Sequence, residues 1–200
     1  MRLMQSKASG KNVLLLFDLT MAVYLLMLQV TIPRLQSYAP DTALFDLSPT
    51  GYSHPHAMTL LESLGHDGRS AYLFPQLALD FVYPGLFAIC FSLMLIWIYS
   101  KRIRPDSKLL YLAMLPALGG LFDYVENILI IQMITTFPDV TKGLVSAASS
   151  STVLKSAFST ASFLLLILGF AFLLKRGPAA GPRGEIQSRN KGQQNSGGNA

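Results

Sequence analysis

The chain alternates between long apolar runs and short polar connections. Four runs are long enough to cross a bilayer as helices, since a spanning helix needs about 20 residues at about 1.5 Å each. None of the four alternates apolar and polar residues with a period of two, which argues against a transmembrane barrel. The pattern predicts an all-α, polytopic four-transmembrane-helix bundle with spans over residues 12–32, 77–100, 109–137 and 152–174.

The connection between the first two predicted spans, residues 33–76, is too short for a domain with its own core. Within it, residues 53–65 read as a short helix, so we expect a short helical extracytoplasmic loop. Ser53 or His54 is placed to cap this helix, and Pro55 suits its first turn. We expect one apolar face of it to lie against the bundle or the headgroup layer, namely Ala57, Leu60, Leu61 and Leu64.

Composition agrees with a membrane protein and marks a separate tail. Hydrophobic residues make up 51% of the 200 residues and charged residues 14%, against about 25% charged residues in soluble domains. Residues 177–200 are rich in Gly, Pro, Gln, Asn and Ser and contain almost no apolar residues. We therefore expect a four-helix transmembrane domain over residues 1–176 and a disordered cytoplasmic tail after it.

Basic residues are distributed unequally between the two sides of the predicted bundle. Twelve of the sixteen Lys and Arg residues lie on the side of the two termini and the loop at 101–108, whereas the opposite side carries Arg34, Arg69 and Lys142. An excess of Lys and Arg marks the cytoplasmic side. The sequence thus predicts a multi-pass protein of the cell (plasma or inner) membrane with cytoplasmic N- and C-termini. The net charge of +5 follows from this topology and requires no nucleic-acid partner.

The third predicted span carries polar residues inside an apolar stretch, LFDYVENILI. On a helical wheel, about a third of the circumference holds Pro116, Gly119, Gly120, Asp123, Glu126 and Asn127. We expect a kink near Pro116 and the following glycine pair. A carboxyl group that faces lipid is costly, so this face is expected to look into the bundle.

The second and fourth spans carry partners for these acids. One stripe of the second span contains Gln76, Asp80, Tyr83, Pro84 and Phe87, and one stripe of the fourth contains Ser151, Lys155, Ser159, Ser162 and Gly169. Measured from the cytoplasmic ends, Asp80 lies at roughly 30 Å, Lys155 at roughly 28 Å, Glu126 at roughly 25 Å and Asp123 at roughly 21 Å. We therefore expect three acids and one lysine at neighbouring levels in the outer half.

This polar cluster has three interpretations. Three carboxyl groups near one ammonium cannot all be ionised cheaply in a low dielectric. Either some stay protonated or another cation helps, and Arg69 and the loop histidines lie on the correct side to do so. The interpretation we adopt is a pocket that binds a small ligand, a lipid headgroup or an ion. The first alternative is a structural or accessory subunit in which Lys155 pairs with Glu126 or Asp123 to fix helix packing. The second is an intramembrane acid/base enzyme that acts on a lipid-like substrate.

The candidate ligand-binding residues come from this cluster and from the loop beside it. They are Asp80, Asp123, Glu126, Asn127, Lys155, Arg69, Tyr72 and Tyr83. Besides the lipid bilayer, the possible partner is a lipid, an ion or a small amphiphile ligand, and the sequence leaves any protein partner unknown.

Other signals for chemistry are weak. Pro55 between His54 and His56 makes joint ligation of a metal awkward, and no spaced second pair of ligands is visible. Cys90 is the single cysteine and allows no intrachain disulfide. No phosphate-binding loop, dinucleotide fingerprint or haem motif is present. The sequence therefore assigns no metal, no cofactor and no catalytic residue, and it leaves enzyme activity open.

Several stretches resemble a family of small four-span membrane proteins, mainly bacterial and of unassigned function. They are FDLSPTGYS, LLESLGHDGRSAYLFPQLALDFVYP, LFDYVENILI, FPD and SSSTVLKSAF, which together span over half the chain. The resemblance implies that the family's marked positions are Gly51, Tyr52, Gly68, Arg69, Tyr72, Asp80, Pro84, Asp123, Glu126, Asn127 and Lys155. It implies no reaction.

Overall fold

The computed structural model describes residues 10–101, 103 and 107–174, so the predicted tail over 177–200 lies outside the described residues. The described residues form helices and connections without strands, which confirms the all-α prediction. Four helical stretches are long and apolar enough to cross a membrane: Gly10–Tyr38, His54–Tyr99, Lys108–Thr136 and Lys142–Leu174. By length and composition, these stretches indicate a multi-pass membrane protein.

The helical stretches change helix type along their length. The first stretch comprises α2 (Gly10–Leu26), η1 (Met27–Thr31) and α3 (Ile32–Tyr38), and the short η2 (Phe45–Leu47) follows it. The second comprises α4 (His54–Ala71), η3 (Tyr72–Gln76), α5 (Leu77–Asp80) and α6 (Tyr83–Tyr99). The third comprises η4 (Lys108–Met114) and α7 (Leu115–Thr136), and the fourth is α8 (Lys142–Leu174) alone.

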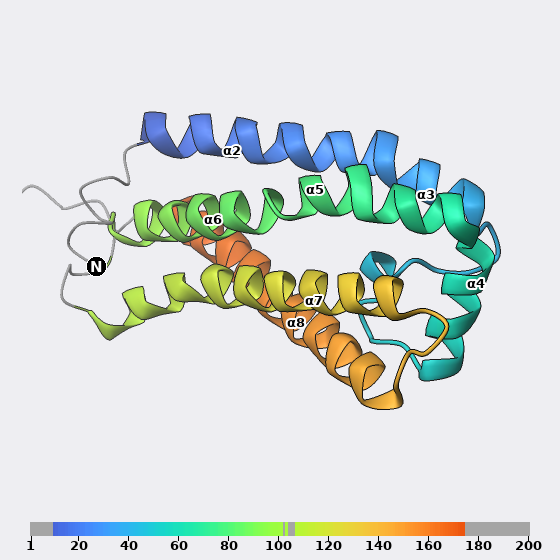
Figure 1. Cartoon of the computed structure of the whole chain (residues 1–200). Coiled ribbons are helices and arrows are strands. Elements are labelled where there is room, and N and C mark those ends of the chain that lie inside the picture. Colours follow the sequence, from blue (N-terminus) through green and yellow to red (C-terminus); the bar gives the residue numbers. More distant parts are fainter. Residues whose placement is uncertain (1–9, 102, 104–106, 175–200) are drawn as a thin grey trace, which may run out of the picture.

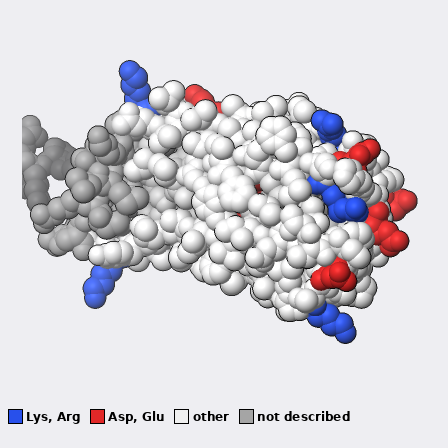
Figure 2. Space-filling model, in the orientation of Figure 1, with Lys and Arg blue, Asp and Glu red and all other residues white. Residues whose placement is uncertain are grey.

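Figure 1 shows α2, α6 and α7 running along the long axis of the molecule, while α8 crosses them obliquely. Helix α2 packs along α6, and α7 packs against both α6 and α8. Helix α4 lies across one end of the bundle. Figure 2 shows most charged side chains gathered toward the two ends, with a wide uncharged zone between them. That zone is the surface expected to face lipid in a membrane.

Two prolines mark helix starts beside the polar cluster. Pro84 stands in the first turn of α6, and the chain turns directly after Asp80, so the second span is interrupted next to its acid. Pro116 stands in the first turn of α7, where the 3₁₀-helix η4 becomes an α-helix. At the position where the sequence predicted a kink, the structure therefore shows a change from a 3₁₀-helix to an α-helix. Gly120 brings α7 close to α6, because a β-carbon there would lie 2.7 Å from the carbonyl oxygen of Pro84.

The elements α3, η2 and α4 and the connections between them form a cap over one end of the bundle. Ser53 caps α4 through its side chain, which accepts a hydrogen bond from the backbone N–H of His56 at 3.4 Å. The predicted apolar face of α4 is buried against the ends of α7 and α8, as Ala57, Leu60, Leu61 and Leu64 are at most 2% exposed. Helix α4 continues beyond residue 65, where Gly65 interrupts it with a φ of 60°.

Helix α8 begins at Lys142, well before the predicted span that starts at residue 152. Thr141 precedes it, and its side-chain oxygen accepts a hydrogen bond from the backbone N–H of Leu144 at 3.2 Å. The small-residue connection that precedes the span is therefore an extra part of the same helix, and it packs against the cap.

Two apolar cores lie on either side of a polar layer. The first joins the cap to α7 and α8 through residues that include Phe45, Leu61, Tyr72, Ile130 and Ala148. The second joins α2, α6 and α8 through residues that include Val13, Phe91, Leu95 and Leu166. The buried polar residues of the layer between them include Asp80, Asp123, Glu126, Asn127 and Thr152. The fold thus holds the predicted polar cluster between two apolar cores.

Candidate functional site

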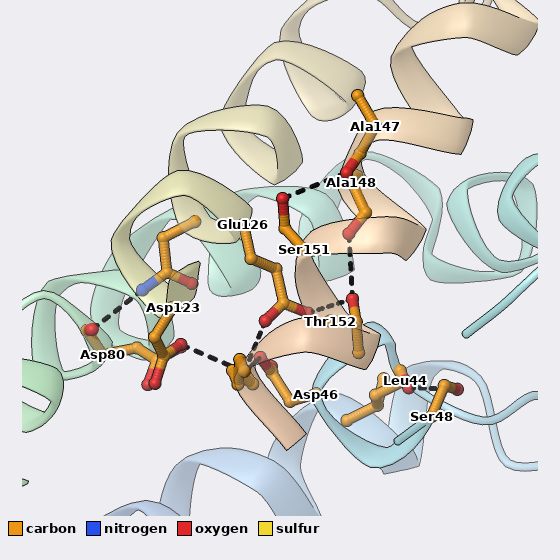
Figure 3. Close-up of polar contacts among 12 residues, drawn as sticks. Leu44, Asp46, Ser48, Asp80, Asp123, Glu126, Ala147, Ala148, Ser151 and Thr152 are labelled. Carbon is orange, nitrogen blue, oxygen red and sulfur yellow. Dashed lines mark hydrogen bonds and ion pairs between the residues drawn. The ribbon is translucent and has the colours of Figure 1, made fainter. Parts of the chain in front are cut away.

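Lys155 on α8 lies at the centre of the polar layer. Its ammonium lies 2.5 Å from Oε2 of Glu126 and 3.0 Å from Oδ1 of Asp123. Figure 3 shows the carboxylates of Asp123 and Glu126 from α7 close to that of Asp46 from η2. The Lys155 side chain is 16% exposed and that of Glu126 is fully buried. The sequence offered Glu126 and Asp123 as alternative partners of Lys155, and the structure places both in contact with it.

Helix α7 presents its polar residues on the predicted inward face. Asp123, Glu126 and Asn127 are buried on the same face as its proline and its glycine pair. Glu126 also accepts a hydrogen bond through Oε1 from the hydroxyl of Thr152 at 2.6 Å. The Glu126 carboxylate is therefore held by two groups of α8.

Asn127 satisfies a backbone carbonyl that a proline leaves open. Pro84 has no N–H to donate to the carbonyl of Asp80 four residues earlier. The side-chain amide of Asn127 donates to that carbonyl at 2.8 Å. Asn127 therefore ties α7 to the break in the second span, a role that the sequence analysis had not assigned.

Asp80 itself is 4% exposed, yet its Oδ2 has no hydrogen-bond partner. A carboxylate oxygen buried without a donor is costly. In the described part of the chain, Lys155 makes ion pairs with Asp46, Asp123 and Glu126, whereas Asp80 makes none. The Asp80 carboxyl group is therefore buried without a hydrogen-bond donor for Oδ2 and without a cation among the described residues.

Asp46 in η2 is a member of the cluster that the sequence analysis missed. Its Oδ2 accepts a hydrogen bond from the hydroxyl of Tyr72 at 2.8 Å, and its Oδ1 lies 3.9 Å from the Lys155 ammonium. Tyr72 is fully buried and positions Asp46. Asp46 belongs to the stretch FDLSPTGYS, which the resemblance had marked. Helical periodicity could not place it, because it lies in a connection between helices.

The segment that follows η2 is fastened to α8. The backbone N–H of Tyr52 donates to the hydroxyl of Ser149 at 2.8 Å, and the Tyr52 ring lies 4.8 Å from that of Phe45. Burial raises the pKa of the Tyr52 phenol well above its ordinary value, so this group stays neutral at physiological pH. Gly51 has a φ of 88°, and a β-carbon there would lie 2.6 Å from the Ser149 hydroxyl oxygen. The turn therefore requires glycine.

Within the described part of the chain, Arg69, His54 and His56 make no ion pair with the acids of the cluster, which corrects the alternative that these side chains help to balance its charge. The guanidinium of Arg69 donates to the carbonyl of Leu61 at 2.7 Å and lies over the ring of Phe137. The rings of His54 and His56 lie within hydrogen-bonding distance of the carbonyls of Val140 and Ala43, respectively. These side chains bond to backbone carbonyls, and none of them makes an ion pair with a buried acid of the described cluster.

A cavity of about 230 Å³ lies beside the ion pairs. Its charged lining comes from Asp46, Asp80, Asp123 and Lys155. Tyr24 of α2 and the predicted Tyr83 of α6 also line it, with ring centroids 5.7 Å apart. We call this cavity the charged pocket.

A larger cavity, of about 760 Å³, adjoins the charged pocket. The two share Tyr24, Tyr83, Ser156, Ser159 and Phe163. The larger cavity lies between α2 and α8 on the surface of α6, and its further lining is mainly apolar, including Phe17, Met21, Phe91, Met94, Leu166 and Phe170.

A third cavity, of about 310 Å³, shares Phe17, Met94 and Phe170 with the second and reaches Trp97. We call the second and third cavities together the lateral groove. From Lys155 to Phe170 along α8, the pocket and groove extend over about 22 Å.

The arrangement can hold a polar group and a long apolar group at once. The described residues include no group of three or more His, Cys, Asp or Glu side chains placed to hold a metal ion. Comparisons with protein-family models, curated proteins and solved structures gave no match. The resemblance to small four-span membrane proteins stays a prediction.

Proposed function

We propose that the protein binds a single-chain amphiphile, with the headgroup in the charged pocket and the tail in the lateral groove. The observation that carries this proposal is the continuity of the two spaces, which share five lining residues. Ligand sites in proteins are typically cavities of about 300–1,000 Å³ with a mainly apolar lining and a few polar groups. The groove with the charged pocket at its end fits this description.

A structural role for the ion pairs is compatible with binding. Glu126 and Asp123 hold Lys155 and join α7 to α8, as expected of buried pairs that fix helix packing. Asp80 takes no part in these pairs and lines the cavity. In a cluster that served packing alone, we would expect no buried carboxyl group to line a cavity without a hydrogen-bond partner. The enzyme hypothesis needs, in addition, a reactive ligand atom within reach of one of these acids.

The proposed tail position places the end of the tail next to Trp97, the single tryptophan of the chain. In lipid nanodiscs, an amphiphile with a hexadecyl tail brominated near its end should quench Trp97 fluorescence in a saturable way. The same amphiphile brominated next to its headgroup should quench it weakly. Unlabelled amphiphile should reverse the saturable part, because the labelled and unlabelled tails compete for one groove.

Ser156→Phe supplies the matching variant, because Ser156 lines both the pocket and the groove. The added ring should abolish saturable quenching. Ser150→Phe adds the same ring at an exposed position of the same helix and should preserve it. Quenching that rises linearly with the labelled amphiphile in the unaltered protein would contradict the proposed function, since it would report bulk lipid only.

We also propose that both termini lie in the cytoplasm of a cell whose plasma or inner membrane holds the protein, and that the cap faces outward. The uneven distribution of Lys and Arg supports this orientation. In intact cells, an impermeant thiol reagent should modify a cysteine placed at the exposed Thr50 and spare one at Ser107. Cys90 is buried and should add no background. Labelling at Ser107 with protection at Thr50 would reverse the orientation.

A further inference from the structure

We propose that the headgroup bound in the charged pocket carries a positive charge, in its simplest form an ammonium group, and that Asp80 is its counter-ion. This inference rests on the amphiphile binding proposed above and names the chemical class of the ligand.

The first argument is the balance of charges in the layer. Four carboxyl groups, those of Asp46, Asp80, Asp123 and Glu126, lie in it, and Lys155 is the cation that pairs with them among the described residues. The Lys155 ammonium is already engaged by two carboxylates within 3.0 Å. An anionic headgroup would therefore meet unneutralised acids, whereas a cationic headgroup would reduce their mutual repulsion.

The second argument is the unsatisfied hydrogen-bond acceptor of Asp80. Its Oδ2 is buried without a donor, and the residue lines the pocket. An ammonium group brings three N–H donors and no acceptor, which matches a site that offers carboxylate oxygens. A hydrogen bond between ionised partners is about twice as strong as one between neutral groups. The ammonium group of the ligand thus supplies the hydrogen-bond donor that Asp80 Oδ2 lacks.

The third argument concerns the walls of the pocket and the kind of cation. Tyr24 and Tyr83 line the junction of pocket and groove, and aromatic rings attract organic cations. The described acids are not arranged as a set of metal ligands. An ammonium group attached to an apolar tail therefore fits the pocket and the groove together better than a bare metal ion.

The test compares three tail-brominated probes of equal length that differ only in the headgroup: hexadecylammonium, hexadecanol and palmitate. Binding to the full chain in zwitterionic nanodiscs is measured by the saturable quenching of Trp97. The ammonium probe should bind about tenfold or more tightly than the other two, the factor that a charge-assisted hydrogen bond provides. This comparison uses the unaltered protein, so it does not depend on the folding of a variant.

Asp80→Asn should weaken the ammonium probe about tenfold and leave hexadecanol unchanged, while Asp80→Glu should retain part of the preference. The carbonyl that Asn127 binds belongs to the backbone and is retained in both variants. Asp139→Asn removes an exposed acid at the cap end and serves as the matched control. It should leave all three affinities unchanged.

The outcomes separate this inference from the proposed function. If the three probes bind equally, or palmitate binds most tightly, the cationic headgroup is wrong while amphiphile binding stands. If the ammonium preference survives Asp80→Asn, Asp80 is not the counter-ion. If no probe gives saturable quenching, the proposed function itself fails.

Discussion

Replacing Leu61 with Asp is expected to lower the free energy of unfolding by about 4 kcal/mol or more. Leu61 is fully buried in the core that joins the cap to α7 and α8. The change removes its apolar packing and places a charge without a partner at the same position. The melting temperature of the detergent-purified protein measures the loss.

Ser63→Asp is the matched control for this experiment. It introduces the same charge at an exposed position of the same helix, two residues further along α4. Surface substitutions of this kind usually change stability by less than about 0.5 kcal/mol. A melting curve for Leu61→Asp that equals that of Ser63→Asp would show that the cap is loosely attached, against the packing described here.

Helical periodicity predicted the parts of this molecule that lie on regular helices. The apolar face of α4 and the polar face of α7 both follow from residue spacing, and both are buried as expected. Counting along the spans also placed Lys155 at the level of Glu126 and Asp123, which it contacts. The rise per residue is nearly constant in a helix, so the position of a residue along the span can be counted from the sequence.

The parts that escaped prediction depend on connections and on local competition for partners. Asp46 stands in a 3₁₀ turn of the cap, whose path is set by contacts such as that of the Tyr52 backbone with Ser149. Arg69 lies on the expected side, but the carbonyl of Leu61 engages its guanidinium. No spacing rule locates side chains that are fixed by tertiary contacts of this kind.

The role of Asn127 links the break in the second span to the candidate pocket. Pro84 opens the helix beside Asp80, and Asn127 secures the freed carbonyl. The carboxyl group of Asp80 is then left to line the cavity instead of bonding to its own helix. A proline, an amide and an acid from two helices thus place one carboxylate where a ligand can meet it.

Lys155→Met is expected to lower stability by about 3–5 kcal/mol, because Glu126 is left buried without its cation. Glu126→Gln should lower stability by less, because Asp123 still pairs with Lys155 at 3.0 Å. The variants are Lys155→Met and Glu126→Gln, and the second keeps an oxygen that can accept from Thr152. The double variant should lose less than the sum of the two single losses, by about 1–3 kcal/mol, because Glu126→Gln removes the charge that Lys155→Met leaves unpaired. Chemical or thermal unfolding of the four proteins measures this coupling.

Lys142→Met and Glu62→Gln form the matched control pair, because both side chains are exposed and neither touches the cluster. Their losses should be small and should add. Strict additivity for Lys155 and Glu126 would show that the two residues do not interact, against the 2.5 Å contact.

Binding of the hexadecylammonium probe to the same variants separates a binding role of the cluster from a packing role. Single variants that fold normally and lose the probe indicate a binding site. Variants that lose stability, while the folded fraction binds the probe unchanged, assign this ion pair to packing and leave the open carboxylate of Asp80 as the group that meets the ligand.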